Sequence, residues 1–425
     1  MISGFFKAKT IAVIGAAREE EKVGHIIFRN LFQNKNLKVI PVNPNASFII
    51  RQKCYASVLD IQDKVELAII AIPAEFVPKV LEQCGKKKIK SAVIISSGFS
   101  EAGNIKLEEQ IKKTAEKYKI QLLGPNVLGF ISPYQDINAS FFKGMPDKGS
   151  IAFISQSGAI GTAVLDASIK NKTGLSGFVS IGNSLLTDFS DFIEYYIKDK
   201  ETKIITLYIE SLKQGKGRRF IDVCKSSSKP IIAIKAGKTT TGAKAAKSHT
   251  AALASEQGVY ESIFKQAGII SLDSIRDLFN LANIYSKYQA IGKRACIVTN
   301  AGGLGVLASD ALDKSGISLP EIPDKLKKLG IKQNPIDLLG DAKADKYYKA
   351  LEILDKETFF DFFLVLLTPQ YMTQPIETAQ ILKELKKPVI ACFIGGEKVE
   401  RAKEFLKDKV PVFDDVADLA ILGKL

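Results

Sequence analysis

Short runs of aliphatic and β-branched residues alternate along the chain with amphipathic stretches of helical period. In the N-terminal third, the strand-like runs are 11–16, 38–42, 66–72, 91–96 and 120–124, and the helical stretches lie near 22–33, 74–86 and 104–118. Strands that alternate with helices are typical of βαβ units. We therefore predict a mostly parallel, doubly wound α/β sheet.

The same pattern restarts twice, which predicts three α/β units. The later strand-like runs are 150–155, 177–182, 203–209, 230–236, 294–300, 362–368 and 388–394. Polar connections at 144–150 and 288–294 separate the groups. A chain of 425 residues is also too long for one core. We expect domains at 1–145, 146–290 and 291–425.

Composition and charge narrow the class of protein. The chain is 46% hydrophobic and 25% charged, as in soluble domains, and no apolar run is long enough to span a bilayer. Its start runs directly into a strand pattern without a signal peptide. Five scattered cysteines and two distant histidines disfavour disulfides and a metal site. These features predict a cytoplasmic protein with no membrane partner and no bound metal.

The net charge of +14 raises the question of nucleic acid binding. The lysines are spread along the chain, without an arginine cluster or a DNA-binding motif. Solvated lysine faces explain the charge, and no nucleic acid partner is expected. The charge also favours anionic ligands such as phosphates, nucleotides or coenzyme A.

The first predicted turn, IAVIGAA, places Gly15 where backbone N–H groups can meet a phosphate. The G-x-G-x-x-G pattern is absent, and the second strand ends in VNPN without an acidic residue for ribose hydroxyls. A redox NAD(P) protein is therefore disfavoured. An anionic cofactor and a unit that binds nothing both remain possible.

The second unit contains a strand, a Ser/Gly turn and a helix start in SIAFISQSGAIG. Ser155 and Ser157 flank Gln156, and the N–H donors at the helix start suit a phosphate. Ser157 could equally be an ordinary N-cap. The GKT at 237–239 is not a P-loop, because Ile232 stands where that motif needs glycine.

His249 is one of only two histidines and lies in GKTTTGAKAAKSHTAALA, which is rich in Gly, Ala, Thr and Lys. A neutral imidazole can accept and donate a phosphoryl group if a carboxylate orients its other nitrogen. Glu210 ends the strand-like LYIE, 249 − 210 = 39 residues earlier, so one strand and one helix can bring the two together. A surface histidine and a solvated carboxylate are the alternatives.

The chain resembles the nucleoside-diphosphate-forming acyl-CoA synthetases, whose relatives include the α subunit of succinyl-CoA synthetase. The resemblance lies in the stretches IAVIGAA, VNPN, SSGFSEAG, GPNVLGF, SQSG, KSHTAALA and NAGGLG. The resemblance covers essentially the whole chain. It implies an N-terminal Rossmann-like CoA-binding domain followed by two flavodoxin-like domains.

The resemblance also implies roles for individual residues. It makes His249 the phosphohistidine, Glu210 its carboxylate partner and Asn126 a residue near the thioester. The implied phosphate ligands are Ser155, Ser157 and Gly158. The implied CoA-binding residues are Gly15, Ala16, Val42, Asn43, Ile72, Pro73, Ser97 and Gly98.

The implied activity is that of the α subunit of an ADP-forming acyl-CoA synthetase. Acyl-CoA, phosphate and ADP would give a small carboxylic acid, CoA and ATP. No ATP-grasp domain is recognised, so ADP/ATP and Mg would bind a partner β subunit in an α2β2 assembly. A succinyl-CoA synthetase-like subunit and a CoA-binding regulator without catalysis are the alternatives. The identity of the acid, and the choice between ADP and GDP, remain open.

Overall fold

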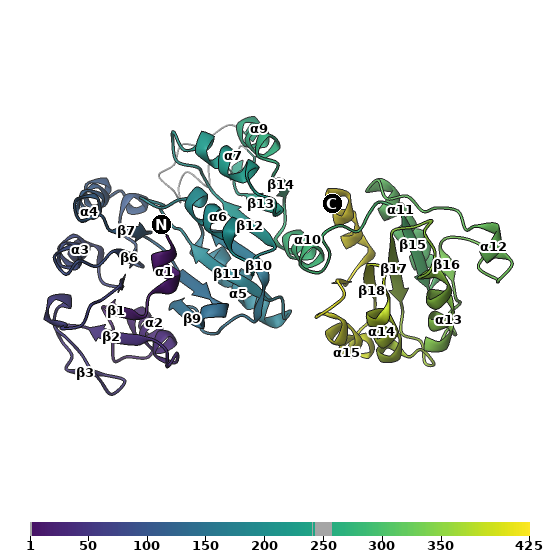
Figure 1. Cartoon of the computed structure of the whole chain (residues 1–425), viewed down its shortest axis with the longest axis horizontal. Coiled ribbons are helices and arrows are strands. Elements are labelled where there is room, and N and C mark those ends of the chain that lie inside the picture. Colours follow the sequence, from purple (N-terminus) through teal and green to yellow (C-terminus); the bar gives the residue numbers. More distant parts are fainter. Residues whose placement is uncertain (1, 240, 243–256) are drawn as a thin grey trace. The chain divides into compact units, whose positions relative to one another are not determined.

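The computed structural model describes residues 2–239, 241–242 and 257–425. The chain divides into two compact units, Met1–Asp273 and Ser274–Leu425 (Figure 1). The first unit contains two large sheets and a two-stranded hairpin, and the second contains one large sheet; helices pack against the faces of the large sheets. The predicted class, doubly wound α/β, is confirmed.

The first sheet is entirely parallel, with strand order β2-β1-β5-β6-β7. Its strands are β1 (Thr10–Ile14), β2 (Lys38–Val42), β5 (Leu67–Ile70), β6 (Ser91–Ile94) and β7 (Gln121–Leu123). The helices that connect or flank them are α1 (Ser3–Lys7), α2 (Val23–Phe32), α3 (Val77–Lys86) and α4 (Ile105–Tyr118), with short 3-10 turns η1 (Val58–Asp60), η2 (Ala74–Phe76) and η3 (Ser100–Ala102). A small hairpin, β3 (Phe48–Ile49) with β4 (Gln52–Lys53), follows β2. Fully buried strands such as β5 explain the unbroken apolar runs in the sequence.

The second sheet has the order β14-β13-β12-β10-β11-β8-β9. Its parallel strands are β10 (Lys148–Ser155), β11 (Leu175–Ser180), β12 (Ile204–Ile209), β13 (Ile231–Lys235) and β14 (Ile270–Leu272). The helices between them are α5 (Gly158–Lys170), α6 (Phe189–Lys198), α7 (Gly217–Lys225) and α9 (Gln257–Ala267). The hairpin β8 (Gly129–Ser132) and β9 (Ile137–Ser140), with the turn η4 (Pro133–Gln135), lies antiparallel to β11 and was not anticipated.

This hairpin ties the two sheets of the first unit together. It precedes residue 145 in the chain, yet it extends the second sheet, so the two sheets share one hydrophobic core. Asn30 of α2 donates to the carbonyl oxygens of Ser140 and Phe142 at 3.0 and 2.8 Å. The neighbouring Asn34 donates to the carbonyl oxygens of Gln135 and Asp136. The cut predicted near 145 therefore does not separate the strands of one sheet from those of the other.

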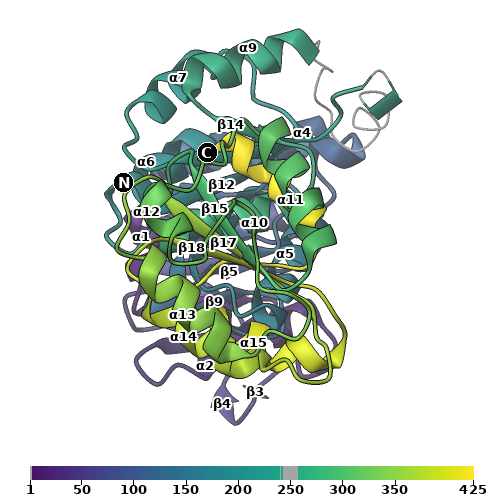
Figure 2. The same cartoon turned by 90° about the vertical axis from the view of Figure 1, so that its right-hand side faces the viewer.

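The second unit is built on a parallel sheet of order β16-β15-β17-β18-β19. The strands are β15 (Ala295–Thr299), β16 (Ile336–Asp337), β17 (Phe362–Leu367), β18 (Val389–Phe393) and β19 (Val412–Phe413). The helices are α10 (Ile275–Lys287), α11 (Gly302–Lys314), α12 (Asp324–Lys327), α13 (Ala344–Leu354), α14 (Pro375–Glu384) and α15 (Glu397–Leu406), with η5 (Val416–Lys424). Helices α13, α14 and α15 pack on one face of the sheet, and α11 packs with η5 (Figure 2). Helix α10, which precedes the predicted cut at 290, groups with this unit.

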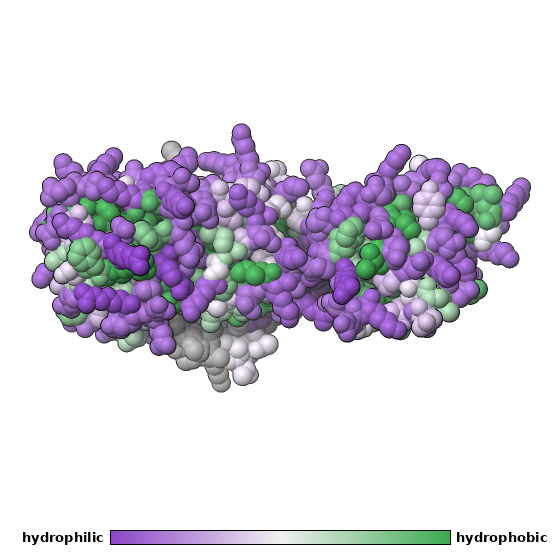
Figure 3. Space-filling view, turned by 90° about the horizontal axis from the view of Figure 1, so that it is seen from below, coloured by the Kyte–Doolittle hydropathy of each residue, from purple (hydrophilic) through white to green (hydrophobic). Residues whose placement is uncertain are grey.

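Hydrophilic side chains cover most of the face shown in Figure 3, with hydrophobic ones in small separate groups. In the described part of the chain, no helix has both the length and the apolar character needed to span a bilayer.

Candidate active site

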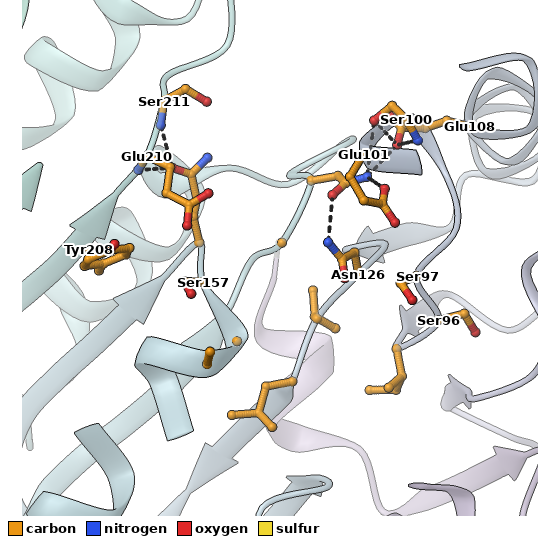
Figure 4. Close-up of a pocket in the computed structure, with 18 of the residues that line it drawn as sticks. Ser96, Ser97, Ser100, Glu101, Glu108, Asn126, Ser157, Tyr208, Glu210 and Ser211 are labelled. Carbon is orange, nitrogen blue, oxygen red and sulfur yellow. Dashed lines mark hydrogen bonds between the residues drawn. The ribbon is translucent and has the colours of Figure 1, made fainter. Parts of the chain in front are cut away.

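The first unit contains an open cleft of about 1560 Å³ (Figure 4). Its walls come from the loops that follow β5 and β6 in the first sheet, and from the ends of β10, β12 and β13 in the second. These are carboxyl ends of parallel strands, the edge at which open α/β sheets bind ligands. The cleft is therefore the candidate active site.

The cleft brings together seven of the residues expected to be functional. Its lining includes Ile72, Pro73, Ser97, Asn126, Ser157, Gly158 and Glu210. Gly237 and Gly242, at the start of the glycine-rich stretch, also line it. His249 lies outside the described residues. Six other expected residues do not line the cleft: Gly15, Ala16, Val42, Asn43, Gly98 and Ser155.

The turn after β1 is closely packed around Gly15. Its N–H donates to the carbonyl oxygen of Val42 at 2.9 Å, and the Asn43 side chain donates to the carbonyl oxygen of Ala16 at 2.7 Å. Gly15 has φ +92°, and an added Cβ would lie 2.2 Å from the carbonyl oxygen of Ala71. The sequence therefore needs glycine here on both steric and conformational grounds.

His25 has a structural position beside the same turn. It is buried in the first turn of α2, and its Nδ1 lies 2.9 Å from the carbonyl oxygen of Ala17. The second histidine of the chain is thus fixed against the backbone and does not line the cleft.

The N-terminus of α5 forms one wall of the cleft. Ser157 is its N-cap, with Oγ accepting the N–H of Ile160 at 3.3 Å. Ser155 is fully buried, and its hydroxyl donates to the carbonyl oxygen of Ser157 at 2.7 Å. Ser155 therefore shapes the turn from behind, while Gly158 and Ala159 present the first helical turn to the cleft. The first N–H groups of a helix have no partner within it and can bind an anion.

Glu210 follows β12 directly and faces the same cleft. Burial raises the pKa of Tyr208, and the Glu210 carboxylate adds to the increase. Burial lowers the pKa of Lys235 at the end of β13, and the charge of Glu210 opposes that decrease. Glu210 thus acts on ionisable groups of two neighbouring strands.

Several polar residues of the cleft were not anticipated from the sequence. The Asn183 amide, from the loop after β11, donates to Glu101 at 2.5 Å and to Glu108 at 2.8 Å across the cleft. Asn126 donates in turn to Asn183 Oδ1 at 3.4 Å. Burial lowers the pKa of the nearby Lys213, and Glu108 opposes the decrease. Glu101 lies in the stretch SSGFSEAG, but Asn183, Glu108 and Lys213 lie in none of the quoted motifs, so only the fold brings them to the cleft.

The geometry supports phosphate chemistry. A helix N-terminus, a carboxylate at a strand end and an asparagine from the opposite sheet line one cleft. An anion at the start of α5 would meet N–H donors, and the carboxylate could orient a basic side chain brought beside it.

Comparisons with known proteins agree with this description. Residues 9–133 match the family described as CoA binding domain, and residues 148–285 match the succinyl-CoA ligase like flavodoxin domain. Acetate–CoA ligase [ADP-forming] I of Archaeoglobus fulgidus is 42% identical over 99% of this chain, which spans 63% of that protein's length. The α subunit of acetate–CoA ligase [ADP-forming] II of Pyrococcus furiosus is 37% identical over 99% of this chain and 96% of its own length.

A solved structure gives the same result for the fold. The dinucleotide-forming acetyl-coenzyme A synthetase 1 of Ca. Korarchaeum cryptofilum, in complex with phosphate and ADP, matches with a TM-score of 0.94. It is 37% identical, and the match covers 100% of this chain and 96% of that chain.

Proposed function

The chain belongs to the ADP-forming acyl-CoA synthetase family, and we propose that it is the α subunit of such an enzyme, carrying its CoA site and its phosphohistidine. The observation that carries the proposal is the cleft, which holds the N-terminus of α5, Asn126 and Glu210 together. The Pyrococcus furiosus relative is itself named a subunit alpha and is similar along almost its whole length.

Coenzyme A would bind to the first sheet at the carboxyl ends of its strands. Ile72, Pro73 and Ser97 line the cleft and would contact the part of CoA near the thiol, with Asn126 beside the thioester. Gly15, Ala16, Val42 and Asn43 form the neighbouring packed turn and would position the remainder of the cofactor. Gly98 supports the Ser97 loop, because its N–H donates to Glu101 at 2.6 Å.

The reaction would begin at the start of α5. Phosphate would displace CoA from acyl-CoA, giving an acyl phosphate whose anionic oxygens meet the first-turn N–H groups at Gly158. A ring nitrogen of His249 would then attack phosphorus, the bond from phosphorus to the acyl oxygen would break, and the carboxylate would leave. Glu210 would accept the N–H of the other ring nitrogen and stabilise the charged ring. Ser157 and Ser155 would maintain the turn that presents these donors.

The second phosphoryl transfer would take place on a partner. An oxygen of the ADP β-phosphate would attack the phosphohistidine, giving ATP and free His249. We propose that ADP and Mg bind an ATP-grasp β subunit in an α2β2 assembly, and that the substrate is a small carboxylic acid such as acetate. The names of both curated relatives specify acetate and ADP.

The test is reconstitution with the partner. The purified chain should bind CoA but should not acquire label from γ-labelled ATP. Addition of an ATP-grasp β subunit should produce a label at His249 that is labile at low pH and stable in base. It should also produce ADP in amounts that depend on the carboxylic acid substrate. Strong ATP-dependent self-labelling by the chain alone would place the nucleotide site within these residues and overturn the subunit assignment.

A His249→Ala variant separates catalysis from CoA binding alone. It should still bind CoA and should lose turnover and label in the presence of the partner. A CoA-binding regulator without catalysis would show no phosphohistidine even in the unmodified chain, so the two functions give different results.

A further inference from the structure

We propose that Gln156 and Tyr260 are positioning residues that fix the backbone of residues 210–212 and, through it, the Glu210 carboxylate. The inference rests on the proposed function, in which Glu210 orients the phosphorylated histidine. Gln156 belongs to the SQSG turn and Tyr260 to α9, and neither lies in the LYIE stretch that contains Glu210.

Gln156 binds the strand end through its side chain and its backbone. Its Oε1 accepts the N–H of Glu210 at 2.6 Å and the N–H of Ser211 at 2.9 Å, as the dashed lines at these residues in Figure 4 show. Both partners are donors, so the acceptor must be the amide oxygen, which fixes the orientation of the side chain. The Gln156 N–H donates to the carbonyl oxygen of Tyr208 at 3.1 Å.

Tyr260 holds the next residue from the opposite side. Its hydroxyl oxygen, presented by α9, accepts the N–H of Leu212 at 2.8 Å. The ring is buried, with the Lys235 ammonium 4.4 Å from its centroid and Phe264 in edge contact. These neighbours immobilise the ring, so the hydroxyl is a fixed acceptor.

Together the two side chains replace the hydrogen bonds that a sheet would supply. The parallel pairing of β12 with β13 ends at Ile209, whose carbonyl oxygen accepts the N–H of Ala236. The next three N–H groups, at 210, 211 and 212, are bound by side chains from two separate elements. Backbone held in this way has one conformation, and this fixes the direction of the Cα–Cβ bond from which the Glu210 carboxylate extends.

The link also connects two parts of the proposed mechanism. Gln156 immediately precedes the N-cap of α5, where the phosphate would bind, and it contacts the backbone that carries Glu210. One side chain therefore sets the separation between the anion site and the carboxylate. Misplacement of a reacting group by about 1 Å can lower a rate on the order of 100-fold.

The experiment uses the complete enzyme with its ATP-grasp partner and measures the rate of label appearing at His249. Gln156→Met keeps the length of the side chain and removes the acceptor, and we expect it to slow labelling by roughly 10- to 100-fold. Tyr260→Phe removes one hydroxyl and should slow labelling by about 3- to 10-fold, because one of three hydrogen bonds is lost. The matched control is Gln110→Met, an exposed site on α4 that should label at the normal rate.

A double-mutant cycle tests whether Gln156 acts through Glu210. If it does, Gln156→Met should have little further effect once Glu210→Gln is present, and CoA affinity should not change in any variant. If Gln156→Met does not fold, the same double-mutant cycle is measured with Tyr260→Phe and Glu210→Gln.

Two results would overturn the inference: normal labelling by Gln156→Met, or equal slowing by Gln156→Met with and without Glu210→Gln. Failure of the unmodified enzyme to label at His249 would refute the proposed function instead.

Discussion

Asn183 is the residue whose replacement should most clearly show how the cleft is held together. Its amide donates to one oxygen of Glu101 at 2.5 Å, to one of Glu108 at 2.8 Å and to the Ser100 hydroxyl at 3.2 Å. Asn183→Asp preserves the shape of the side chain and exchanges this donor for a third carboxylate. We expect it to destabilise the first unit in a pH-dependent way.

The magnitude follows from two contributions. Each hydrogen bond to a charged group contributes about 1.5–3 kcal/mol, and two of them are lost. Like charges about 4 Å apart repel by about 4 kcal/mol at an effective dielectric constant of 20, and the half-buried position and proton uptake reduce this. We therefore expect a loss of about 3–6 kcal/mol for Asn183→Ala, and a loss about 1–2 kcal/mol larger for Asn183→Asp at neutral pH.

The Asn183→Asp variant should lose stability as the pH rises. Repulsion raises the pKa of a carboxyl in the folded Asn183→Asp variant above its unfolded value near 4. At pH values between the unfolded and the folded pKa, the folded state binds more protons than the unfolded state, so the free energy of unfolding decreases as pH rises. The additional loss of stability that repulsion causes, relative to Asn183→Ala, should be greatest above the raised pKa and should disappear as pH falls toward about 4. High salt should also reduce it, because ions screen the repulsion.

Urea unfolding followed by circular dichroism measures the effect, since the chain has no tryptophan. The transition of residues 274–425 provides an internal control that should not move, and Asn36→Asp, at an exposed site, provides a matched one. If the Asp and Ala variants are equally stable at pH 8 and again at pH 5, the carboxylate introduced at position 183 does not repel Glu101 and Glu108, and the reasoning is refuted.

Three further predictions concern the proposed function. Glu210→Gln should keep the fold and slow phosphorylation of His249 on the order of 100-fold, because an amide cannot stabilise the imidazolium charge; unchanged single-turnover labelling would remove Glu210 from the mechanism. Gly15→Ala should weaken CoA binding at least about tenfold in calorimetry, since strain of about 1–3 kcal/mol must be relieved by moving the turn; normal affinity would place CoA elsewhere. His25→Ala should lower the melting temperature yet label normally, because the described hydrogen bond of the His25 side chain is to the carbonyl oxygen of Ala17 and the residue does not line the cleft.

The sequence was sufficient to predict the parallel strands and the turn at the start of α5. Parallel strands covered by helices on both faces, such as β5 and β17, appear as unbroken apolar runs, and Ser-x-x-Ile at the start of α5 has the pattern of an N-cap. The hairpin at 129–140 was missed because its strands are four residues each and mix Ser and Asn with apolar residues.

The supporting residues of the site could not be predicted from local pattern. Gln156 and Glu210 are 54 residues apart, and Leu212 and Tyr260 are 48 apart, so their contacts depend on strand order. The buried position of Ser155 likewise follows from the direction of the turn, which two similar serines do not reveal. The sequence shows which polar group each residue has, whereas the hydrogen-bond partner of that group depends on the fold.

The link between α2 and the β8–β9 hairpin has a consequence for the behaviour of the protein in solution. Strand β9 ends the second sheet, and an uncovered edge strand can pair with a strand of another molecule and begin aggregation. Helix α2 lies against β9, and Asn30 occupies the carbonyl oxygen of Ser140 on that strand. Asn138 further bonds the carbonyl oxygens of Phe142 and Gly144, just beyond the strand. A cell that produces this chain in quantity therefore gains protection against intermolecular strand pairing from side chains far from the chemistry.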